Sequence, residues 1–249
     1  MSGTLIFLTI SLAICCAPIL GTDPNGFDER YPEENPDLFE GDIELDGESP
    51  FDRNAVGDRR RLWPNGIVPY EISSYFNTYD KTLFRAAMKE IEMVTGSCIK
   101  FVPRTSTHHY YVKIITGQGC HSSIGFRNRL QTVTLGHGCV RKGIAMHELL
   151  HALGFFHEQS RPDRDQFITV VGSNIIKGRE NNFKIFYPPT LNTQGFPYDY
   201  DSLMHYGAHA FAKDRSKPTI IPRRIGARIG QRSHLSSIDI MELKKLYRC

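Results

Sequence analysis

The sequence lacks any apolar run long enough to cross a lipid bilayer. Its longest, Leu5 to Cys16, has about a dozen residues, whereas a membrane-spanning helix needs about 20. Residues 1–21 also lack charged side chains, and small residues near Ala17 and Gly21 offer cleavage positions. Such a segment is typical of a secretory signal peptide. We therefore expect residues 1–21 to be removed and the rest to be secreted and extracellular, with no membrane partner.

Other absences narrow the class of protein further. No Asn-x-Ser/Thr sequence occurs, so no N-linked glycan is expected. Internal repeats and low-complexity tracts are missing too, and 40% of the 249 residues are hydrophobic. This composition excludes collagen, a coiled coil and wholesale disorder, and the chain is long enough to form a substantial core.

Cysteine is scarce outside the predicted signal peptide. Four cysteines remain after Cys15 and Cys16 are removed, namely Cys98, Cys120, Cys139 and Cys249. An even number in a secreted chain indicates two disulfides, and arithmetic alone allows three pairings.

The charges are divided unequally along the chain, although 30 Lys+Arg and 27 Asp+Glu give a net charge of only +3. Residues 22–53 hold 12 acidic and two basic residues, a net charge of −10. Residues 54–249 hold the other 15 acidic and 28 basic residues, a net charge of +13. The acidic segment also has four prolines and no sustained apolar period, which predicts extended, weakly structured chain. This asymmetry predicts two parts with different roles.

From residue 54 the pattern is that of a globular α+β domain. Runs of β-branched and aromatic residues predict strands at 67–72, 99–102, 110–115 and 131–135. Apolar residues at helical spacing predict a first helix capped by Thr78 and stopped at Gly96, and a second at 142–155.

The last third of the domain has less regular patterning. Residues 159–235 are rich in Gly, Pro, Asn and Asp, which predicts mostly irregular structure. A terminal helix follows, with Ser236 and Asp239 placed as a capping box and Leu235 placed to pack on Ile240.

One stretch carries residues suited to chemistry. His147 and His151 are four residues apart on the second predicted helix, so both imidazoles project from one face and can bind one zinc ion. Glu148 can reach a water on that metal and act as general base. His157 is six residues past His151, and Gly154 can end the helix in a left-handed conformation that returns His157 to the metal. Three protein ligands leave a position open for water, as in catalytic zinc sites.

A plainer interpretation of the same residues is a pair of surface histidines on an amphipathic helix. The apolar residues around them argue against it, because they indicate a buried helix, and a buried imidazole pair needs a partner. The glycine and the third histidine at this spacing also favour a metal site. The surrounding apolar residues are Ala145, Leu149, Leu150, Ala152 and Leu153.

Two motifs together resemble the astacin family of zinc endopeptidases, which are metzincins. The first is H-E-x-x-H-x-x-G-x-x-H followed by Glu158, with Arg161, Asp163, Arg164 and Asp165 shortly after it. The second is Ser202-Leu203-Met204-His205-Tyr206, which is similar to the family's Met-turn, S-x-M-H-Y. The resemblance covers nearly all of residues 54–249. It implies an α+β, two-lobed domain, with a twisted mixed sheet and two long helices in the N-terminal lobe. The C-terminal lobe would be mostly irregular with a terminal helix, and a zinc cleft would lie between the lobes.

The resemblance also implies roles for individual residues. Met204 would form an apolar floor beneath the zinc. Tyr206 would be a further zinc ligand that moves off the metal to stabilise the oxyanion. The family pairs its cysteines first with last and second with third, which implies Cys98–Cys249 and Cys120–Cys139. The charged residues after Glu158 are expected to form structural ion pairs, and His205 is expected to be structural.

The acidic segment contains a third motif of this resemblance. Phe39-Glu40-Gly41-Asp42 is similar to the family's F-x-G-D, whose aspartate binds the zinc in place of the catalytic water. Asp42 would therefore hold the enzyme latent, and residues 22–53 would be an inhibitory pro-segment. The alternative is that these acids are merely solvated charge.

Activation is expected by cleavage between Arg53 and Asn54, where the mature family N-terminus falls. In the family the new amino group is buried and pairs with the glutamate after the third histidine, which implies Glu158 here, and the cleavage would supply the cation that a buried carboxylate needs. Arg59-Arg60-Arg61 is a competing cleavage site. Cleavage there would remove the residues that should reach Glu158, so Arg53 is favoured.

The sequence thus predicts a secreted zinc endopeptidase with one Zn²⁺ per chain, made as a zymogen. Glu148 would take a proton from the water, and the enzyme would hydrolyse internal peptide bonds of extracellular proteins. We expect a stand-alone catalytic domain, a monomer, protein or peptide substrates, a trypsin-like activating protease and no nucleic-acid partner. The +13 charge predicts a preference for acidic surfaces or acidic side chains near the scissile bond. The alternatives are a catalytically silent, zinc-containing binding protein and an adhesive domain that uses the basic surface.

Overall fold

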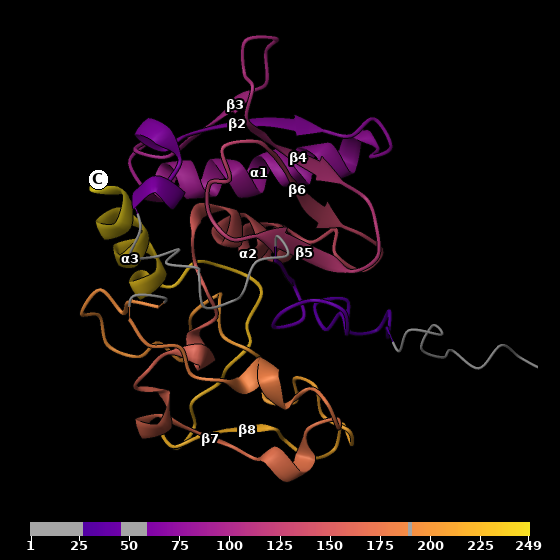
Figure 1. The fold of residues 1–249 in the computed structure, drawn as a ribbon, viewed down its shortest axis with the longest axis vertical. Helices are drawn as coiled ribbons and strands as arrows, with labels where there is room; N and C mark the ends of the chain where they lie inside the picture. Colours follow the sequence, from indigo (N-terminus) through magenta and orange to yellow (C-terminus); the bar gives the residue numbers. More distant parts are fainter. Residues whose placement is uncertain (1–26, 46–58, 189–190) are drawn as a thin grey trace, which may run out of the picture.

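The computed structural model describes residues 27–45, 59–188 and 191–249. The predicted signal peptide and the predicted cleavage between Arg53 and Asn54 lie outside these residues. Figure 1 shows an upper lobe that contains the sheet with helices α1 (Thr78–Val94) and α2 (Lys142–Leu153), and a lower lobe of mostly irregular chain. The expected α+β architecture is therefore present. In the described part of the chain, none of the helices combines the length and apolar character needed to cross a bilayer.

A mixed sheet of six strands forms the upper lobe, in the order β1-β5-β6-β4-β2-β3. Strand β5 is antiparallel to β6, and the other neighbouring pairs are parallel. Strand β1 belongs to the acidic segment and adds to the outer edge of β5. The strands are β1 Ile43–Glu44, β2 Ile67–Ile72, β3 Lys100–Pro103, β4 Tyr111–Ile115, β5 Cys120–Ser123 and β6 Leu130–Leu135.

Helix α1 (Thr78–Val94) begins with a capping box. The Asn77 side chain accepts a hydrogen bond from the Asp80 N–H at 3.0 Å, and the Asp80 carboxylate accepts one from the Asn77 N–H at 3.3 Å. The N-cap is therefore Asn77, and the expectation of Thr78 is wrong by one residue, because Asn77 is extended while Thr78 is already helical. The buried face of the helix consists of Phe84, Ala87, Met88 and Ile91.

Helix α2 (Lys142–Leu153) packs against α1 and against β5, and Figure 1 shows it on the side of the upper lobe that faces the lower lobe. Every residue of α2 except Lys142 is buried, and its apolar side chains join those of α1 and the sheet in one core. Burying a side chain such as Leu149 or Leu153 contributes about 1.5–3 kcal/mol. The core therefore fixes the position of α2 and of any functional residue on it.

The lower lobe has little regular structure. Its two short strands, β7 (Ile168–Val170) and β8 (Ile220–Pro222), form an antiparallel ribbon beside a second apolar cluster. Helix α3 (Ser237–Tyr247) then leaves this lobe, and its Leu243 and Leu246 pack into the core of the upper lobe. The predicted capping box of Ser236 and Asp239 is present.

Two disulfides are present in the described chain. Cys98–Cys249 ties the end of the chain to the loop after α1, and Cys120–Cys139 ties β5 to the loop before α2. These are the pairs that the family resemblance implies. The chain-entropy contribution of a loop of 19 residues is about 3 kcal/mol.

The acidic segment is more ordered than its composition predicts. Residues 27–45 form a series of turns that end in β1, and Figure 1 shows this indigo segment between the two lobes. Glu40, Asp42 and Ile43 are at most 1% exposed. The segment has few apolar residues of its own, so it becomes buried only by packing against the rest of the protein.

Candidate active site

The end of α2 brings three histidines together. His147 and His151 lie one turn apart on this buried helix, and neither side chain is exposed. Gly154 caps the helix with a φ of 114°, a left-handed conformation that glycine adopts far more readily than other residues. The chain therefore turns sharply after Leu153, and His157, which is 1% exposed, returns to the first two histidines.

The Nε2 atoms of these histidines converge on one carboxylate of the acidic segment. Oδ2 of Asp42 lies 3.2 Å from His147 Nε2 and 3.1 Å from His157 Nε2. Oδ1 of Asp42 lies 3.5 Å from His151 Nε2. The structure thus brings together the three predicted ligands and the predicted plug.

This donor set fits a zinc ion. Ligand atoms about 2.0–2.1 Å from one tetrahedral zinc lie about 3.4 Å apart, and the Nε2 atoms of His147 and His157 are 3.3 Å apart. Two buried atoms, Asp42 Oδ1 and His151 Nε2, have no hydrogen-bond partner among the described residues, and a metal would satisfy both. Burial lowers the pKa of His147 to about 4, which keeps its imidazole in the neutral form that binds metals.

The other ring nitrogen of each histidine has a partner as well. His147 Nδ1 lies 2.9 Å from the Leu203 carbonyl oxygen, and His151 Nδ1 lies 2.7 Å from the Phe155 carbonyl oxygen. His157 Nδ1 lies 2.7 Å from Oε2 of Glu40. Acceptors at Nδ1 hold that proton and leave Nε2 free to bind a metal.

Glu148 lies beside the histidines with both carboxylate oxygens buried and unpartnered among the described residues. Its carboxylate and ligand atoms of Asp42 and His147 all lie within 4.8 Å of one another. Burial, assisted by the Asp42 charge, raises the pKa of Glu148 well above its ordinary value. A buried carboxyl next to a metal site with no partner of its own is placed to exchange a proton with a bound water.

The predicted Met-turn contacts the site through the Leu203 carbonyl oxygen, which lies 2.9 Å from His147 Nδ1. Met204 is 2% exposed and belongs to the same core cluster as α2. The turn is tied to α3, because the Asp239 carboxylate accepts hydrogen bonds from Ser202 Oγ at 2.7 Å and Leu203 N at 2.9 Å. His205 is buried between the Tyr198 hydroxyl and the Tyr206 carbonyl, in agreement with a structural role.

Tyr206 contacts both the metal-site histidine His157 and the acidic segment. Its ring centroid lies 4.7 Å from that of His157, and its hydroxyl donates a hydrogen bond to the Glu40 carbonyl oxygen at 2.5 Å. Burial raises the pKa of Tyr206 well above its ordinary value, so the hydroxyl remains protonated and can donate.

Glu158 lies in a network of buried charges. Its carboxylate accepts hydrogen bonds from Arg161 at 3.2 Å and from the Asp199 N–H at 2.7 Å. Arg161 also pairs with Asp163 at 2.9 Å, and a separate pair joins Arg164 to Asp165. The expected ion pairs after the third histidine are thus present. The predicted partner of Glu158, Asn54, lies outside the described residues.

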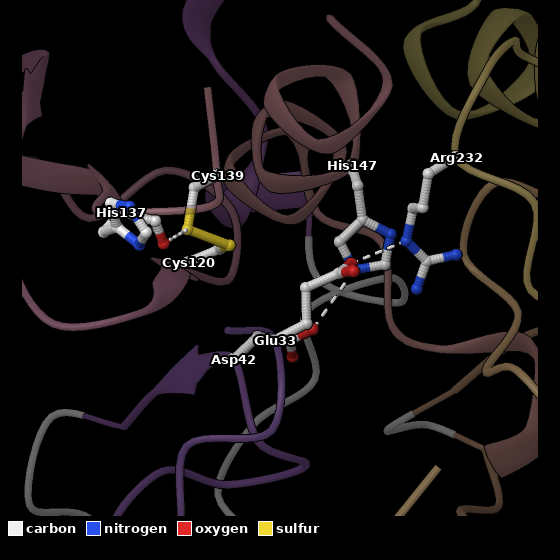
Figure 2. The surroundings of a disulfide bond; sticks show 7 residues. All are labelled: Glu33, Asp42, Cys120, His137, Cys139, His147 and Arg232. Carbon is white, nitrogen blue, oxygen red and sulfur yellow. Dashed lines mark hydrogen bonds and ion pairs between the residues drawn. A yellow bond between two sulfur atoms is a disulfide. The ribbon is translucent and has the colours of Figure 1, made fainter. Parts of the chain in front are cut away.

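Sequence reasoning missed several residues that hold the acidic segment in the cleft. Glu33 pairs with Arg232 and Glu34 with Arg215, both at 2.6 Å. Figure 2 shows the Glu33 carboxylate beside His147 and directed at the Arg232 guanidinium. The opposite net charges of the two parts favour such pairs, but no spacing rule links residues about 200 positions apart.

A cavity of about 270 Å³ next to Tyr206 is lined by residues of both the acidic segment and the rest of the protein. The segment contributes Tyr31 and Glu34, and Phe211, Arg215 and Arg232 are among the other lining residues. The Arg215 guanidinium also lies over the Tyr31 ring, 3.5 Å from its centroid. The cleft beside the metal site thus has two guanidinium groups that are both paired with the segment.

Comparison with known proteins gives consistent matches. Residues 55–248 match the family model of astacin, which describes a peptidase family. Zinc metalloproteinase nas-4 of Caenorhabditis elegans is 41% identical over 219 residues, covering 84% of this chain and 69% of that protein. Astacin-like metalloprotease toxin 1 of Loxosceles intermedia is 42% identical, covering 85% of this chain and 81% of that protein.

Other relatives are longer, and one solved structure matches the fold. Zinc metalloproteinase nas-15 of Caenorhabditis elegans is 43% identical over 196 residues, and the chain spans 34% of its length. High choriolytic enzyme 1, a hatching enzyme zinc protease from Oryzias latipes, superimposes with a TM-score of 0.72 at 36% identity. That match covers 76% of this chain and 96% of the other, and it confirms the predicted fold.

Proposed function

The chain belongs to the astacin family of zinc peptidases, and from this premise we propose that residues 54–249 form a secreted zinc endopeptidase that residues 22–53 hold latent. The observation that carries the proposal is the convergence of three histidine Nε2 atoms and the Asp42 carboxylate on one point. The substrates would be extracellular proteins or peptides, and the enzyme would act as a monomer.

A zinc ion held by His147, His151 and His157 would act as a Lewis acid on the scissile carbonyl and lower the pKa of the attacking water toward about 7. Glu148 would accept the proton of that water and deliver it to the leaving amine. Its carboxylate is buried and has no hydrogen-bond partner among the described residues, which leaves it free to accept that proton and supports this role. The Tyr206 hydroxyl would donate a hydrogen bond to the developing oxyanion.

Latency would follow from where the acidic segment lies. Asp42, whose carboxylate lies 3.2 Å from His147 Nε2, would take the place of the catalytic water, and β1 pairs with the edge of β5, where an extended substrate backbone could otherwise pair. Cleavage between Arg53 and Asn54 by a trypsin-like protease would release the segment. The new amino group would then pair with Glu158, whose pKa is raised by burial despite the neighbouring Arg161.

The cleft also supports a substrate preference. Loss of the segment would remove Glu33 and Glu34 from Arg232 and Arg215 and leave two guanidinium groups beside the cavity next to Tyr206. An acidic substrate side chain could pair with either group. We therefore expect cleavage sites enriched in Asp and Glu, as the +13 charge of residues 54–249 also predicts.

Replacing the general base tests the proposed mechanism. After trypsin treatment, Glu148→Gln should retain zinc but lose about 10²–10⁴-fold in casein hydrolysis, the usual contribution of a positioned general base. Glu180→Gln, which changes an exposed acid of the lower lobe, is the matched control and should keep wild-type turnover.

Two outcomes would count against the proposal. Wild-type turnover by Glu148→Gln would remove Glu148 from the mechanism. A wild-type chain that binds zinc after activation but cleaves no protein would favour the catalytically silent binding protein. Removal of zinc with a chelator, followed by its return, should abolish and then restore hydrolysis.

A further inference from the structure

Two of the three metal-site histidines are oriented by the protease domain itself, and the third is not. The acceptors for Nδ1 of His147 and His151 are the backbone carbonyls of Leu203 and Phe155, both within residues 54–249. The acceptor for Nδ1 of His157 is the side chain of Glu40, which belongs to the acidic segment. Cleavage after Arg53 would therefore remove an acceptor from His157 only.

Glu40 is held firmly in this position. Its side chain has no exposed surface, and its carboxylate accepts hydrogen bonds from His157 Nδ1 and from the Ser160 hydroxyl. Its backbone carbonyl accepts the Tyr206 hydroxyl. Three groups of the protease domain thus bond to Glu40. A carboxylate that served only as solvated charge would have no such partners.

The backbone around Glu40 explains how the segment reaches both sides of one imidazole. Glu40 has a φ of 49° and Gly41 a φ of 81°, both in the left-handed region. A Cβ atom at Gly41 would lie 2.6 Å from the Glu33 carbonyl oxygen and 2.6 Å from Phe211, so a side chain would not fit there. This tight turn directs the Glu40 carboxylate to Nδ1 of His157 and the Asp42 carboxylate to Nε2 of the same ring.

We propose that Glu40 is a positioning residue for the metal site, and that the acidic segment strengthens zinc binding through the outer face of His157 as well as blocking it through Asp42. A carboxylate that accepts the Nδ1 proton fixes the ring orientation and makes Nε2 a better ligand. Loss of such an outer partner typically weakens metal binding by 10–100-fold. The latent chain therefore holds zinc more tightly than Asp42 alone would account for. This inference rests on the proposed function, because it takes His157 as a zinc ligand.

The test measures zinc affinity rather than activity, using the full-length chain and a chromogenic chelator that competes for the metal. Glu40→Ala should raise the zinc dissociation constant about 10–100-fold, and Glu40→Gln, which keeps an uncharged acceptor, should raise it less. Glu44→Gln is the matched control, because Glu44 is a carboxylate of the same segment that pairs with His121, which is not a ligand histidine. It should leave zinc affinity unchanged.

A double-mutant cycle with Asp42 separates this role from simple docking of the segment. If Glu40 acts through Nδ1 of His157, Glu40→Ala should still weaken zinc binding about tenfold or more in an Asp42→Ala background. If Glu40 only holds the segment so that Asp42 can reach the metal, it should have no effect once Asp42 is absent, and that result would overturn the inference.

The outcomes distinguish this inference from the proposed function. Equal zinc affinity in the wild type, Glu40→Ala and Glu44→Gln would overturn the role of Glu40 while leaving zinc catalysis intact. Failure of the wild-type chain to bind zinc tightly would overturn both. The ¹⁵N chemical shift of His157 Nδ1 gives a second readout, because the shift should change in Glu40→Ala and not in Glu44→Gln.

Discussion

Helix α2 and the acidic segment 27–45 meet in the same cleft, but different forces hold them there. All of α2 after Lys142 is buried, and most of its side chains are apolar. The acidic segment holds eight acidic residues and one basic residue, and its buried carboxylates all face groups of the protease domain. The helix is held by the apolar core of its own lobe. The segment is held by contacts between its carboxylates and groups of the protease domain. A segment attached in this way could leave without opening the core, which is what the proposed inhibitory role requires.

Among the changes that test this comparison, the largest expected effect comes from Asp42, the carboxylate on which the histidines converge. Asp42→Ala in the full-length chain should let the uncleaved precursor hydrolyse casein, because a water could then occupy the position of Asp42. If the competent fraction rises from about 1% to a majority, activity before trypsin treatment should increase roughly 50-fold or more.

The control for this change is another acid of the same segment. Asp37 is exposed, so Asp37→Ala should leave the precursor as inactive as the wild type. A silent Asp42→Ala precursor that becomes active on trypsin treatment would indicate that the other contacts of the segment are sufficient for latency.

The contrast between helix α2 and the acidic segment also explains which features could be predicted from the sequence. The grouping of His147, His151 and His157 follows from helical spacing and from one glycine, which are local properties. Strand β2 was predicted with its observed bounds, and β4 and β6 within one residue, because β-branched and aromatic residues are concentrated in them. Asp42 was predicted only through resemblance to a family motif, since nothing in residues 22–53 identifies which of 12 acids is buried.

The elements that were missed depend on distant partners. Strand β5 (Cys120–Ser123) is short and largely polar, and it is a strand because β6 and β1 pair with it on either side. The ribbon of β7 and β8 joins residues about 50 positions apart. Glu40 is the clearest case, because its partner His157 lies 117 positions away. No local pattern could select it from its neighbours.

An intermediate effect is expected at the glycine that ends α2. Gly154→Ala should destabilise the domain by about 1–2 kcal/mol and weaken zinc binding, because an alanine disfavours the φ of 114° that returns His157 to the site. Space is not the limitation, since a Cβ atom there would meet its nearest neighbours at 3.8 Å. Gly172→Ala is the control, because Gly172 has no positive φ and open space around its Cα atom. Denaturant unfolding measures the stability, and competition with a chelator measures the zinc affinity. If neither changes in Gly154→Ala, the end of the helix does not determine the geometry of the metal site.

The smallest expected effect concerns the ion pairs that join the segment to the lower lobe. A peptide of residues 22–53 added to the activated enzyme should inhibit it, and Glu34→Gln in that peptide should raise the inhibition constant about 2–5-fold. This is the range of a partly exposed pair worth about 0.5–1 kcal/mol, and the side chains of Glu34 and Arg215 are 15% and 28% exposed.

Added salt should weaken inhibition by the wild-type peptide more than inhibition by the Glu34→Gln peptide, because screening acts on the charge that the variant lacks. Glu29→Gln, at an exposed acid of the same peptide, should match the wild type. Equal inhibition by all three peptides at low salt would mean that burial of Glu40, Asp42 and Ile43 holds the segment without help from the charges around it.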